Sequence, residues 1–482
     1  MSIEVTELSN GLRVVSDFMD TVESVSLGAW VEVGTRDEAA KINGMSHLLE
    51  HMAFKGTERR SAVGIVEEIE AVGGHLNAYT AREHTAYYAK ILKQDLELAV
   101  DIIADILQHS VMDEGELARE QGVIVQEINQ SHDTPDDVVF DFFQETAFPE
   151  QALGRPVLGS AALVRGMNRD AILGYMKDHY SASRIVFAAA GNLDHVRLVR
   201  LVEDAFDALP EPVDGTREPA RYVGGANRQP RDLEQAHVLL GMKGIAFEDE
   251  DFHAASMFST LLGGGMSSRL FQEVREKRGL AYSIYSYLSS YTDGGLFGVY
   301  AGTGKDDIGD LVPLVFGEIG KLADGAGGGE DAEIARARAQ IKASILMSLE
   351  STAARCEKLA RQMIVFKRPI PIDETIARID AVDGAAIRRV AERLLSERPT
   401  ITALGPVPDL EDLEKLAAAP SAAACASVPL AVSHPCGFLS RFRGGRYRRD
   451  CGQREGQGDS LLPPSRCYMF LDRCRSNRVG TT

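Results

Sequence analysis

A proline- and glycine-rich run near the middle of the sequence divides the chain into two long segments. The run begins with Pro-Glu-Pro-Val-Asp-Gly and has no periodic apolar pattern, which is typical of a linker. With 482 residues, the chain also exceeds the size of one ordinary hydrophobic core. We therefore predict an N-terminal half at residues 1–210, a linker at 211–232 and a C-terminal half at 233–419.

The first half combines strand and helix patterns in a mixed order. An Asn-Gly turn between β-branched runs predicts an N-terminal hairpin. Further strands are predicted at residues 22–34, 75–80, 85–92 and 185–190. Apolar spacing predicts helices at residues 43–54, with Asn43 as the N-cap, and at 62–72, 94–108, 113–130, 136–146 and 195–209.

The second half repeats this order. Strands are predicted at residues 236–242, 282–290, 295–302 and 400–404, and helices include residues 252–262 and 267–277. The order lacks the strict strand and helix alternation of a doubly wound sheet. We therefore predict an α+β fold with two homologous halves that arose by tandem duplication.

Composition and charge narrow the function classes. The fractions of 44% hydrophobic and 26% charged residues are those of a soluble globular protein. A formal net charge of -19 disfavours nucleic acid as a partner and suits a basic substrate. No apolar run is long enough to span a bilayer, and the N-terminus lacks a secretory signal pattern. We expect a cytoplasmic protein without a membrane span.

The segment at residues 420–482 differs in composition from the rest of the chain. It contains ten arginines and no lysine against four acidic residues, and five of the six cysteines. Only Cys356 precedes it, so a disulfide framework is not expected and a reduced compartment is the simplest interpretation. We interpret this segment as a disordered or aberrant extension, with a docking segment as the alternative.

The most informative motif is His47-Leu-Leu-Glu50-His51 on the first predicted helix. Residues four apart on a helix share a face, so both imidazoles can reach one ion, with Glu50 beside them on the same turn. Catalytic zinc takes three protein ligands and leaves a position for water, and a nearby carboxylate that does not bind the metal can act as the base. Glu50 is the candidate base.

A third ligand must come from elsewhere in the chain. The helix predicted at residues 113–130 carries Glu116, Glu120 and Glu127. Glu120 and Glu127 are seven residues apart and face the same way, so helical geometry permits either to ligate while the other supports the site. The alternatives are two histidines that are merely packed, and a structural zinc module. Structural zinc usually has four protein ligands and many sulfurs, and neither is seen.

The sequence resembles the pitrilysin-type (M16) zinc metallopeptidases, and within them it is most similar to the mitochondrial processing peptidase beta subunit and its bacterial relatives. The likeness rests on the segments at residues 47–57, 76–80 and 119–127 and extends over most of residues 5–405. It implies that the halves are α/β sandwiches that form a clamshell around a central chamber. It also implies one Zn²⁺ per chain.

The resemblance further implies a role for each site residue. His47, His51 and Glu127 would be the metal ligands, Glu50 the base and Glu120 an auxiliary acidic residue. The choice of Glu127 over Glu120 as the ligand comes from the family alone.

Four more residues are implied to bind the substrate. Asn77 and Ala78 lie on a predicted strand to whose edge an extended peptide could pair. Arg275 and Tyr282 match an Arg and a Tyr that reach the substrate from the second half in related peptidases. The alternatives are an ordinary strand, and a surface arginine with a core tyrosine. A glycine run at residues 263–265 lacks the Lys-Ser/Thr ending of a nucleotide loop, so ATP is not implied.

The predicted function is that of a zinc metalloendopeptidase that cleaves unstructured peptides, basic or presequence-like ones included. The alternative is a non-catalytic core or scaffold subunit of the same fold. The presence of Glu50 argues against it, because a scaffold has no physical need of a catalytic base. Members of the family act alone, as homodimers or as heterodimers with a related subunit, and the sequence leaves these three states open.

Overall fold

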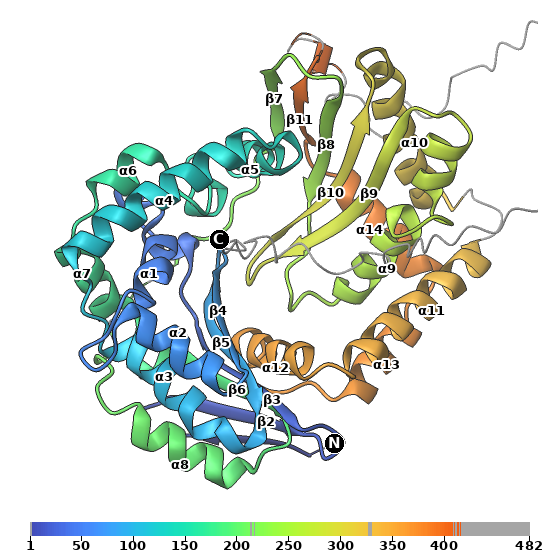
Figure 1. Ribbon diagram of the computed structural model, residues 1–482. Coiled ribbons are helices and arrows are strands. Elements are labelled where there is room, and N and C mark those ends of the chain that lie inside the picture. Colours follow the sequence, from blue (N-terminus) through green and yellow to red (C-terminus); the bar gives the residue numbers. More distant parts are fainter. Residues whose placement is uncertain are drawn as a thin grey trace, which may run out of the picture.

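The computed structural model describes residues 2–212, 215, 217–325, 330–407, 409, 412, 413 and 415. The segment predicted as a tail at residues 420–482 lies outside the described residues. Two mixed β-sheets form the centres of two halves of the molecule (Figure 1).

The first sheet has six strands in the order β1-β2-β6-β3-β5-β4. The predicted N-terminal hairpin is confirmed, because β1 and β2 pair antiparallel across the Asn-Gly turn. Strand β4 lies at one edge of the sheet and, among the described strands, pairs with β5 alone. The strands are β1 (Ser2–Glu7), β2 (Arg13–Phe18), β3 (Ser24–Val31), β4 (His75–Thr80), β5 (Thr85–Leu92) and β6 (Ile185–Gly191).

The second sheet repeats the connections of the first. Its order is β7-β11-β8-β10-β9, with β7 parallel to β11 and the other pairs antiparallel. The first sheet has the same pattern from β2 to β4, with β2 parallel to β6. The predicted tandem halves are therefore confirmed. The strands are β7 (Gly225–Pro230), β8 (Ala236–Lys243), β9 (Ala281–Ser290), β10 (Gly295–Thr303) and β11 (Thr400–Gly405).

Helices cover one face of each sheet from within the same half. Leu48, Ile102 and Leu198 belong to the large core under the first sheet, and Phe258 and Val390 belong to that under the second. The helices are α1 (Met45–Ala53), α2 (Ala62–Ala71), α3 (Leu96–Gln108), α4 (Glu114–His132), α5 (Pro135–Ala147), α6 (Ala161–Gly166), α7 (Arg169–His179), α8 (His195–Ala205), α9 (Phe252–Gly263), α10 (Ile308–Ala323), α11 (Glu330–Ser348), α12 (Thr352–Val365), α13 (Ile372–Asp380) and α14 (Gly384–Leu395).

The other face of each sheet is covered by a helix from the opposite half. Helix α12 packs on β2, β3 and β6, where Leu359 and Met363 share a buried cluster with Trp30 (Figure 1). Helix α5 packs in the same way on β7, β8 and β11. Phe143 of α5 lies directly over Gly241, where an added Cβ would come within 2.1 Å of the ring. Each half therefore supplies a helix that covers one face of the other half's sheet.

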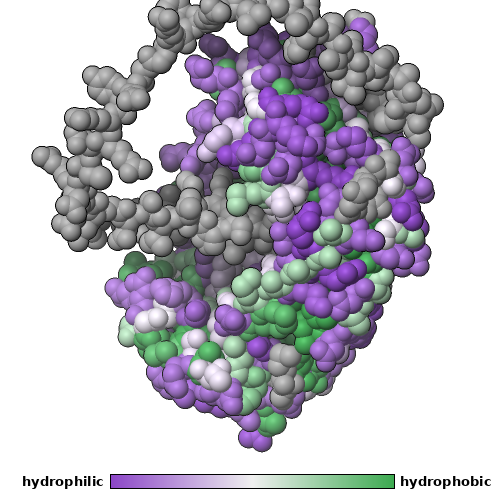
Figure 2. Space-filling view, turned by 90° about the vertical axis from the view of Figure 1, so that its right-hand side faces the viewer, coloured by the Kyte–Doolittle hydropathy of each residue, from purple (hydrophilic) through white to green (hydrophobic). Residues whose placement is uncertain are grey.

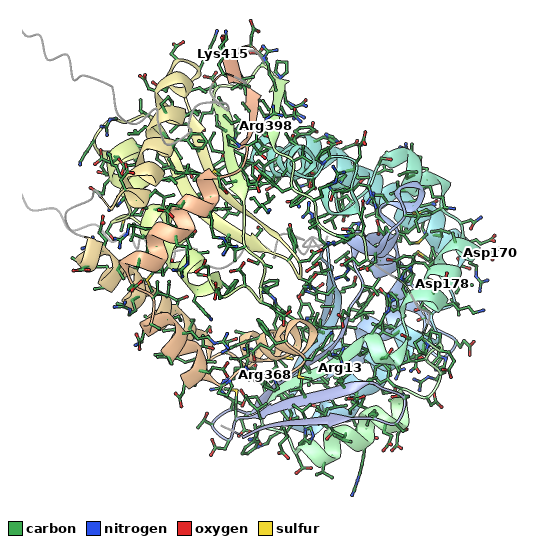
Figure 3. All side chains as sticks on the ribbon, turned by 180° about the vertical axis from the view of Figure 1, so that it is seen from behind. Arg13, Asp170, Asp178, Arg368, Arg398 and Lys415 are labelled. Atoms are coloured by element: carbon green, nitrogen blue, oxygen red, sulfur yellow. The ribbon has the colours of Figure 1, made fainter. Side chains whose placement is uncertain are left out.

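Polar contacts fasten α12 to the first half. Arg13 of β2 donates from a guanidinium nitrogen to the carbonyl oxygen of Met363 at 3.1 Å. Glu32 lies 3.4 Å from Arg13 and 2.9 Å from Nζ of Lys367, just beyond α12. Figure 3 shows Arg13 from behind, near the end of this helix.

A second ionic cluster joins the halves at the turns between β4 and β5 and between β9 and β10. The Arg36 guanidinium, whose side chain is 1% exposed, lies 2.6 Å from Glu83 and 2.7 Å from Asp293. Arg217, in the segment predicted as a linker, pairs with Asp37 at 2.9 Å. Removing Arg36 would take from the buried carboxylate of Glu83 its nearest charged partner.

Three details differ from the sequence predictions. The segment predicted as a linker contains β7, because an edge strand tolerates glycine and proline without an apolar pattern. The helix predicted at residues 267–277 contains a π-helical turn, η6 (Phe271–Glu276). Asn43 does not cap α1, since Gly44 holds the cap position and Asn43 donates to Glu38 instead.

No helix in the described part of the chain is long and apolar enough to cross a membrane. Figure 2 shows a face of the molecule on which hydrophilic side chains predominate, with smaller apolar areas between them.

We predict that Leu359→Ala, in the second half, loosens the sheet of the first half. Leu359 is 3% exposed, and truncating a buried leucine costs about 2–5 kcal/mol. Hydrogen exchange at the amides of β6 should accelerate, as measured by mass spectrometry. The control is Leu346→Ala in α11, where the leucine is 50% exposed. Unchanged protection of β6 would contradict the role given to α12.

Candidate metal centre

The start of α1 is held by a buried carboxylate. Oε1 of Glu38 accepts from the Ser46 amide at 2.7 Å, and Oε2 accepts from the Gly44 amide at 2.8 Å. Gly44 has φ of 100°, and a Cβ there would come within 2.9 Å of the Leu158 carbonyl oxygen. Glu38 thus satisfies amides that the helix leaves unpaired, and it fixes the first turn, which carries His47.

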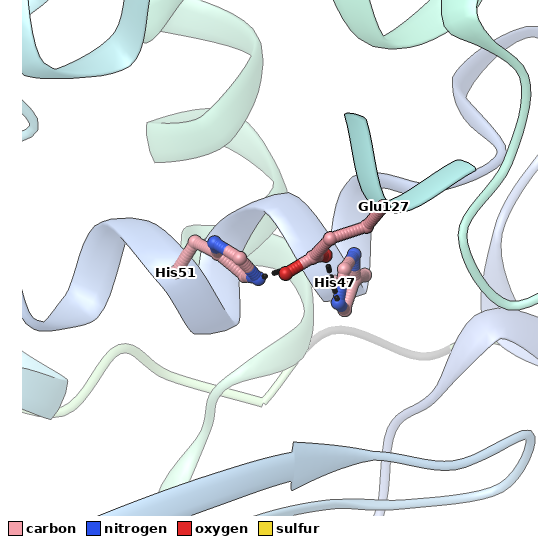
Figure 4. A group of neighbouring side chains, drawn as sticks. All are labelled: His47, His51 and Glu127. Carbon is pink, nitrogen blue, oxygen red and sulfur yellow. Dashed lines mark ion pairs between the residues drawn. The ribbon is translucent and has the colours of Figure 1, made fainter. Parts of the chain in front are cut away.

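His47, His51 and Glu127 converge between α1 and α4 (Figure 4). Oε2 of Glu127 lies 3.7 Å from Nε2 of His47 and 3.6 Å from Nε2 of His51. Tetrahedral zinc with bonds of about 2.1 Å needs ligand atoms about 3.4 Å apart. The spacing of these atoms is close to that value. Helix α4 therefore brings a third candidate ligand atom to the two imidazoles of α1.

The same atoms lack ordinary partners. Both ring nitrogens of His47 and Oε2 of Glu127 are buried without a hydrogen bond among the described residues. Buried polar atoms are costly unless they are paired, so this arrangement calls for a bound group. Two imidazole nitrogens and one carboxylate form the donor set of a catalytic zinc site. The residues present therefore fit a divalent cation such as Zn²⁺.

Glu120 contacts His51 from outside the group of three candidate ligands. Its Oε2 is 2.9 Å from Nδ1 of His51, and its Oε1 is 2.7 Å from Nζ of Lys55. These two bonds hold the pKa of Glu120 below its usual value although burial acts to raise it. A charged Glu120 orients the His51 ring so that Nε2 faces Glu127, as outer partners of metal ligands commonly do.

Glu50 lies on the same helix but outside the group of ligand atoms. Its side chain is buried, and Oε2 accepts a hydrogen bond from Oγ1 of Thr80 at 2.6 Å. Burial raises the pKa of Glu50, with the charge of Glu127 acting in the same direction, and the bond from Thr80 opposes the shift. A carboxylate with a raised pKa is suited to accepting and releasing a proton.

The pKa values of the two imidazoles shift in opposite directions. Burial and the neighbouring His51 lower the pKa of His47 to about 3, so this ring is neutral at neutral pH and able to ligate. For His51, burial acts to lower the pKa, but Glu120, Glu127 and Glu50 outweigh it and raise the value. Metal binding to His51 would therefore compete with protonation of the ring.

Asn77 and Ala78 lie on β4, which is an edge strand as the predicted strand addition requires. Asn77 is exposed, and its side-chain oxygen accepts from the Ala78 amide at 2.8 Å. Ala78 is 4% exposed and contributes to the core. Of the two side chains, that of Asn77 is accessible to a ligand.

Arg275 and Tyr282 form a separate cluster in the second half. The Arg275 guanidinium lies 4.7 Å from the ring centroid of Phe271 and 4.9 Å from that of Tyr282. Tyr282 is 75% exposed, so it is not the core tyrosine of the alternative interpretation. Neither residue has a hydrogen bond or ion pair with the metal-site residues within the described ranges.

Sequence reasoning missed three residues that shape the site, namely Glu38, Lys55 and Thr80. Lys55 and Thr80 stand inside the segments that carry the family resemblance, but neither their spacing nor their type indicates which carboxylate they contact. Glu38 has no sequence signal, because its contact with the start of α1 depends on the path of the intervening loop.

Two tandem α+β halves, with a His-His-Glu group found only in the first among the described residues, define a two-part protein with one candidate metal centre. Two family models match the chain. Residues 13–161 match insulinase (peptidase family M16), and residues 166–341 match the peptidase M16 inactive domain. The chain therefore belongs to peptidase family M16.

Relatives extend this result over most of the chain. A Streptomyces coelicolor protein named as an uncharacterized zinc protease is 42% identical over 417 residues, or 85% of this chain and 90% of the relative. A probable mitochondrial-processing peptidase subunit beta of Arabidopsis thaliana is 39% identical over 427 residues, or 85% of this chain and 80% of the relative. The family that the sequence resembles is thus confirmed.

Solved structures share the fold. A protease from Helicobacter pylori superimposes with a TM-score of 0.78 at 22% identity, covering 84% of this chain and 99% of that one. A peptidase M16 inactive domain from Pseudomonas fluorescens gives a TM-score of 0.77 at 19% identity, with coverage of 84% and 98%. The arrangement of two halves is therefore that of solved M16 proteins.

We predict that Glu127→Gln lowers the affinity for Zn²⁺ by at least about 100-fold, because loss of an outer partner alone costs up to that amount. Competition with a chromogenic chelator measures this. The control is Glu116→Gln, on the same helix, where the carboxylate pairs with Arg119. Wild-type affinity in Glu127→Gln together with loss in Glu120→Gln would reverse the assignment of the third ligand.

Proposed function

We propose that this protein is a zinc-dependent metalloendopeptidase that holds one Zn²⁺ through His47, His51 and Glu127. The observation that carries the proposal is their convergence beside the buried carboxylate of Glu50. Membership of peptidase family M16 and relatives named as zinc proteases support it.

Each residue has a distinct part in the proposed reaction. Bound zinc supplies Lewis acidity toward water and the peptide carbonyl. Glu50 takes a proton from the attacking water and passes it to the leaving amine. Glu120 keeps His51 in the orientation that ligation needs, through the hydrogen bond to Nδ1. No covalent bond between substrate and protein is required.

The open edge of β4 supports an extended peptide as the substrate. An edge strand presents unpaired backbone groups, and a peptide that adds to it is recognised mainly through its own backbone. Thr80 of the same strand contacts Glu50, so a peptide on β4 would lie near the base. A folded protein could not supply such a strand without unfolding locally.

Several features stay predictions. They are the substrate contacts of Asn77, Ala78, Arg275 and Tyr282, the cytoplasmic location, the oligomeric state and the boundaries of the halves at residues 210 and 233. The enclosed chamber between the halves also stays a prediction.

We predict that Glu50→Gln keeps zinc and loses peptide cleavage by at least about 100-fold, because the amide cannot act as the base. Initial rates on an unstructured fluorogenic peptide measure turnover, and metal analysis measures zinc. Glu67→Gln, an exposed position on α2, is the matched control and should retain full activity.

The same comparison separates an enzyme from a scaffold. A non-catalytic subunit would give the same negligible rate before and after the substitution. Cleavage by the wild type that persists in Glu50→Gln, or under strong chelation, would overturn the proposed mechanism.

Net charge leads to a prediction about substrate preference. The formal charge of -19 should raise the local concentration of cationic peptides at low ionic strength. Matched basic and acidic peptides should therefore differ in kcat/KM at low salt, with the basic peptide favoured and the difference shrinking as salt is added. Equal rates at low salt would contradict this preference.

A further inference from the structure

The hydroxyl of Thr80 makes the shortest polar contact of Glu50 that the described residues provide. Oγ1 lies 2.6 Å from Oε2 of Glu50 and 3.4 Å from the carbonyl oxygen of Ser46. A hydroxyl has one proton to donate, and a carboxylate is a stronger acceptor than a carbonyl oxygen. The proton is therefore directed to Glu50.

The two partners come from different elements, and both are constrained. Glu50 lies on α1, whose first turn is fixed by Glu38. Thr80 ends β4, where it stands opposite Thr85 in the ladder between β4 and β5. The contact thus joins the helix that carries the candidate ligands to the edge strand on which the substrate is proposed to bind.

A base without such a contact would have freedom to turn. The side chain of glutamate has three rotatable bonds, and the terminal one is poorly restricted by its own geometry. A hydrogen bond to one carboxylate oxygen fixes the plane of the group and hence the direction in which the other oxygen points. Proton transfer requires that direction to be maintained within a narrow range.

We propose that Thr80 is a positioning residue that orients the carboxylate of Glu50 for proton transfer during peptide cleavage. This inference rests on the proposed function, and it assigns a specific task to a side chain of the substrate strand. Because Thr80 acts through Glu50 and not on the peptide, its loss should change kcat and leave KM nearly unchanged.

Two substitutions separate the hydroxyl from the rest of the side chain. Thr80→Val keeps the branched shape and removes the hydroxyl, and kcat should fall by about 10- to 100-fold, the range expected for a lost hydrogen bond to a charged group. Thr80→Ser keeps the hydroxyl and should restore kcat to within a few-fold of the wild type.

The matched control is Thr85→Val, directly opposite on β5. Thr85 is fully buried, and its hydroxyl donates to the carbonyl oxygen of Val33 at 3.0 Å, away from Glu50. This substitution should alter stability without altering kcat. Zinc affinity, measured by chelator competition, should be unchanged in all three variants, because Thr80 and Thr85 contact none of the candidate ligands.

A double substitution tests that Thr80 acts through Glu50. In the Glu50→Gln background, Thr80→Val should cause no further loss of residual activity, since the base is already absent. Wild-type kcat in Thr80→Val, an equal loss in Thr80→Ser or Thr85→Val, or a fully additive loss in the double variant would overturn the inference. These outcomes are distinct from failure of the proposed function, in which the wild type itself shows no zinc-dependent cleavage.

Discussion

The fold depends on each sheet being covered on both faces. Within the described residues, helices of the same half cover one face of each sheet, and a helix of the other half covers the second face. Helix α12 crosses to the first sheet, and α5 crosses to the second. A sheet face lined by Trp30, Val186 and Ala188 would expose apolar surface to water without α12. The two halves are therefore one cooperative structure in which the position of each depends on a helix of the other.

The packing of the two halves also bears on α1 and α4, the helices that carry the candidate site. Helix α5 follows directly on α4, so the segment that carries Glu127 continues into the helix that packs on the second half. The ionic cluster around Arg36 joins the turn after β4 to the second half in the same way. Helix α4 and the turn after β4 are therefore both linked to the second half.

The site itself combines two kinds of carboxylate environment. Glu120 accepts two charge-assisted hydrogen bonds and stays ionised, whereas burial raises the pKa of Glu50. One group is thereby suited to orienting His51 and the other to exchanging a proton. The two glutamates differ in environment because Glu120 pairs with His51 and Lys55, whereas Glu50 is buried beside the hydroxyl of Thr80.

The sequence alone determined the features that arise from local geometry. Spacing of four residues placed His47 and His51 on one helical face, and the extended segments predicted from the sequence coincide with most strands of both sheets. Helical geometry left Glu120 and Glu127 open, because residues seven apart on a helix face the same way. The tertiary structure places Glu127 in the group of atoms that could hold one metal ion, and it places Glu120 against Nδ1 of His51. The contacts of Glu38 and Thr80 were likewise decided by packing, since they join segments whose approach no local pattern encodes.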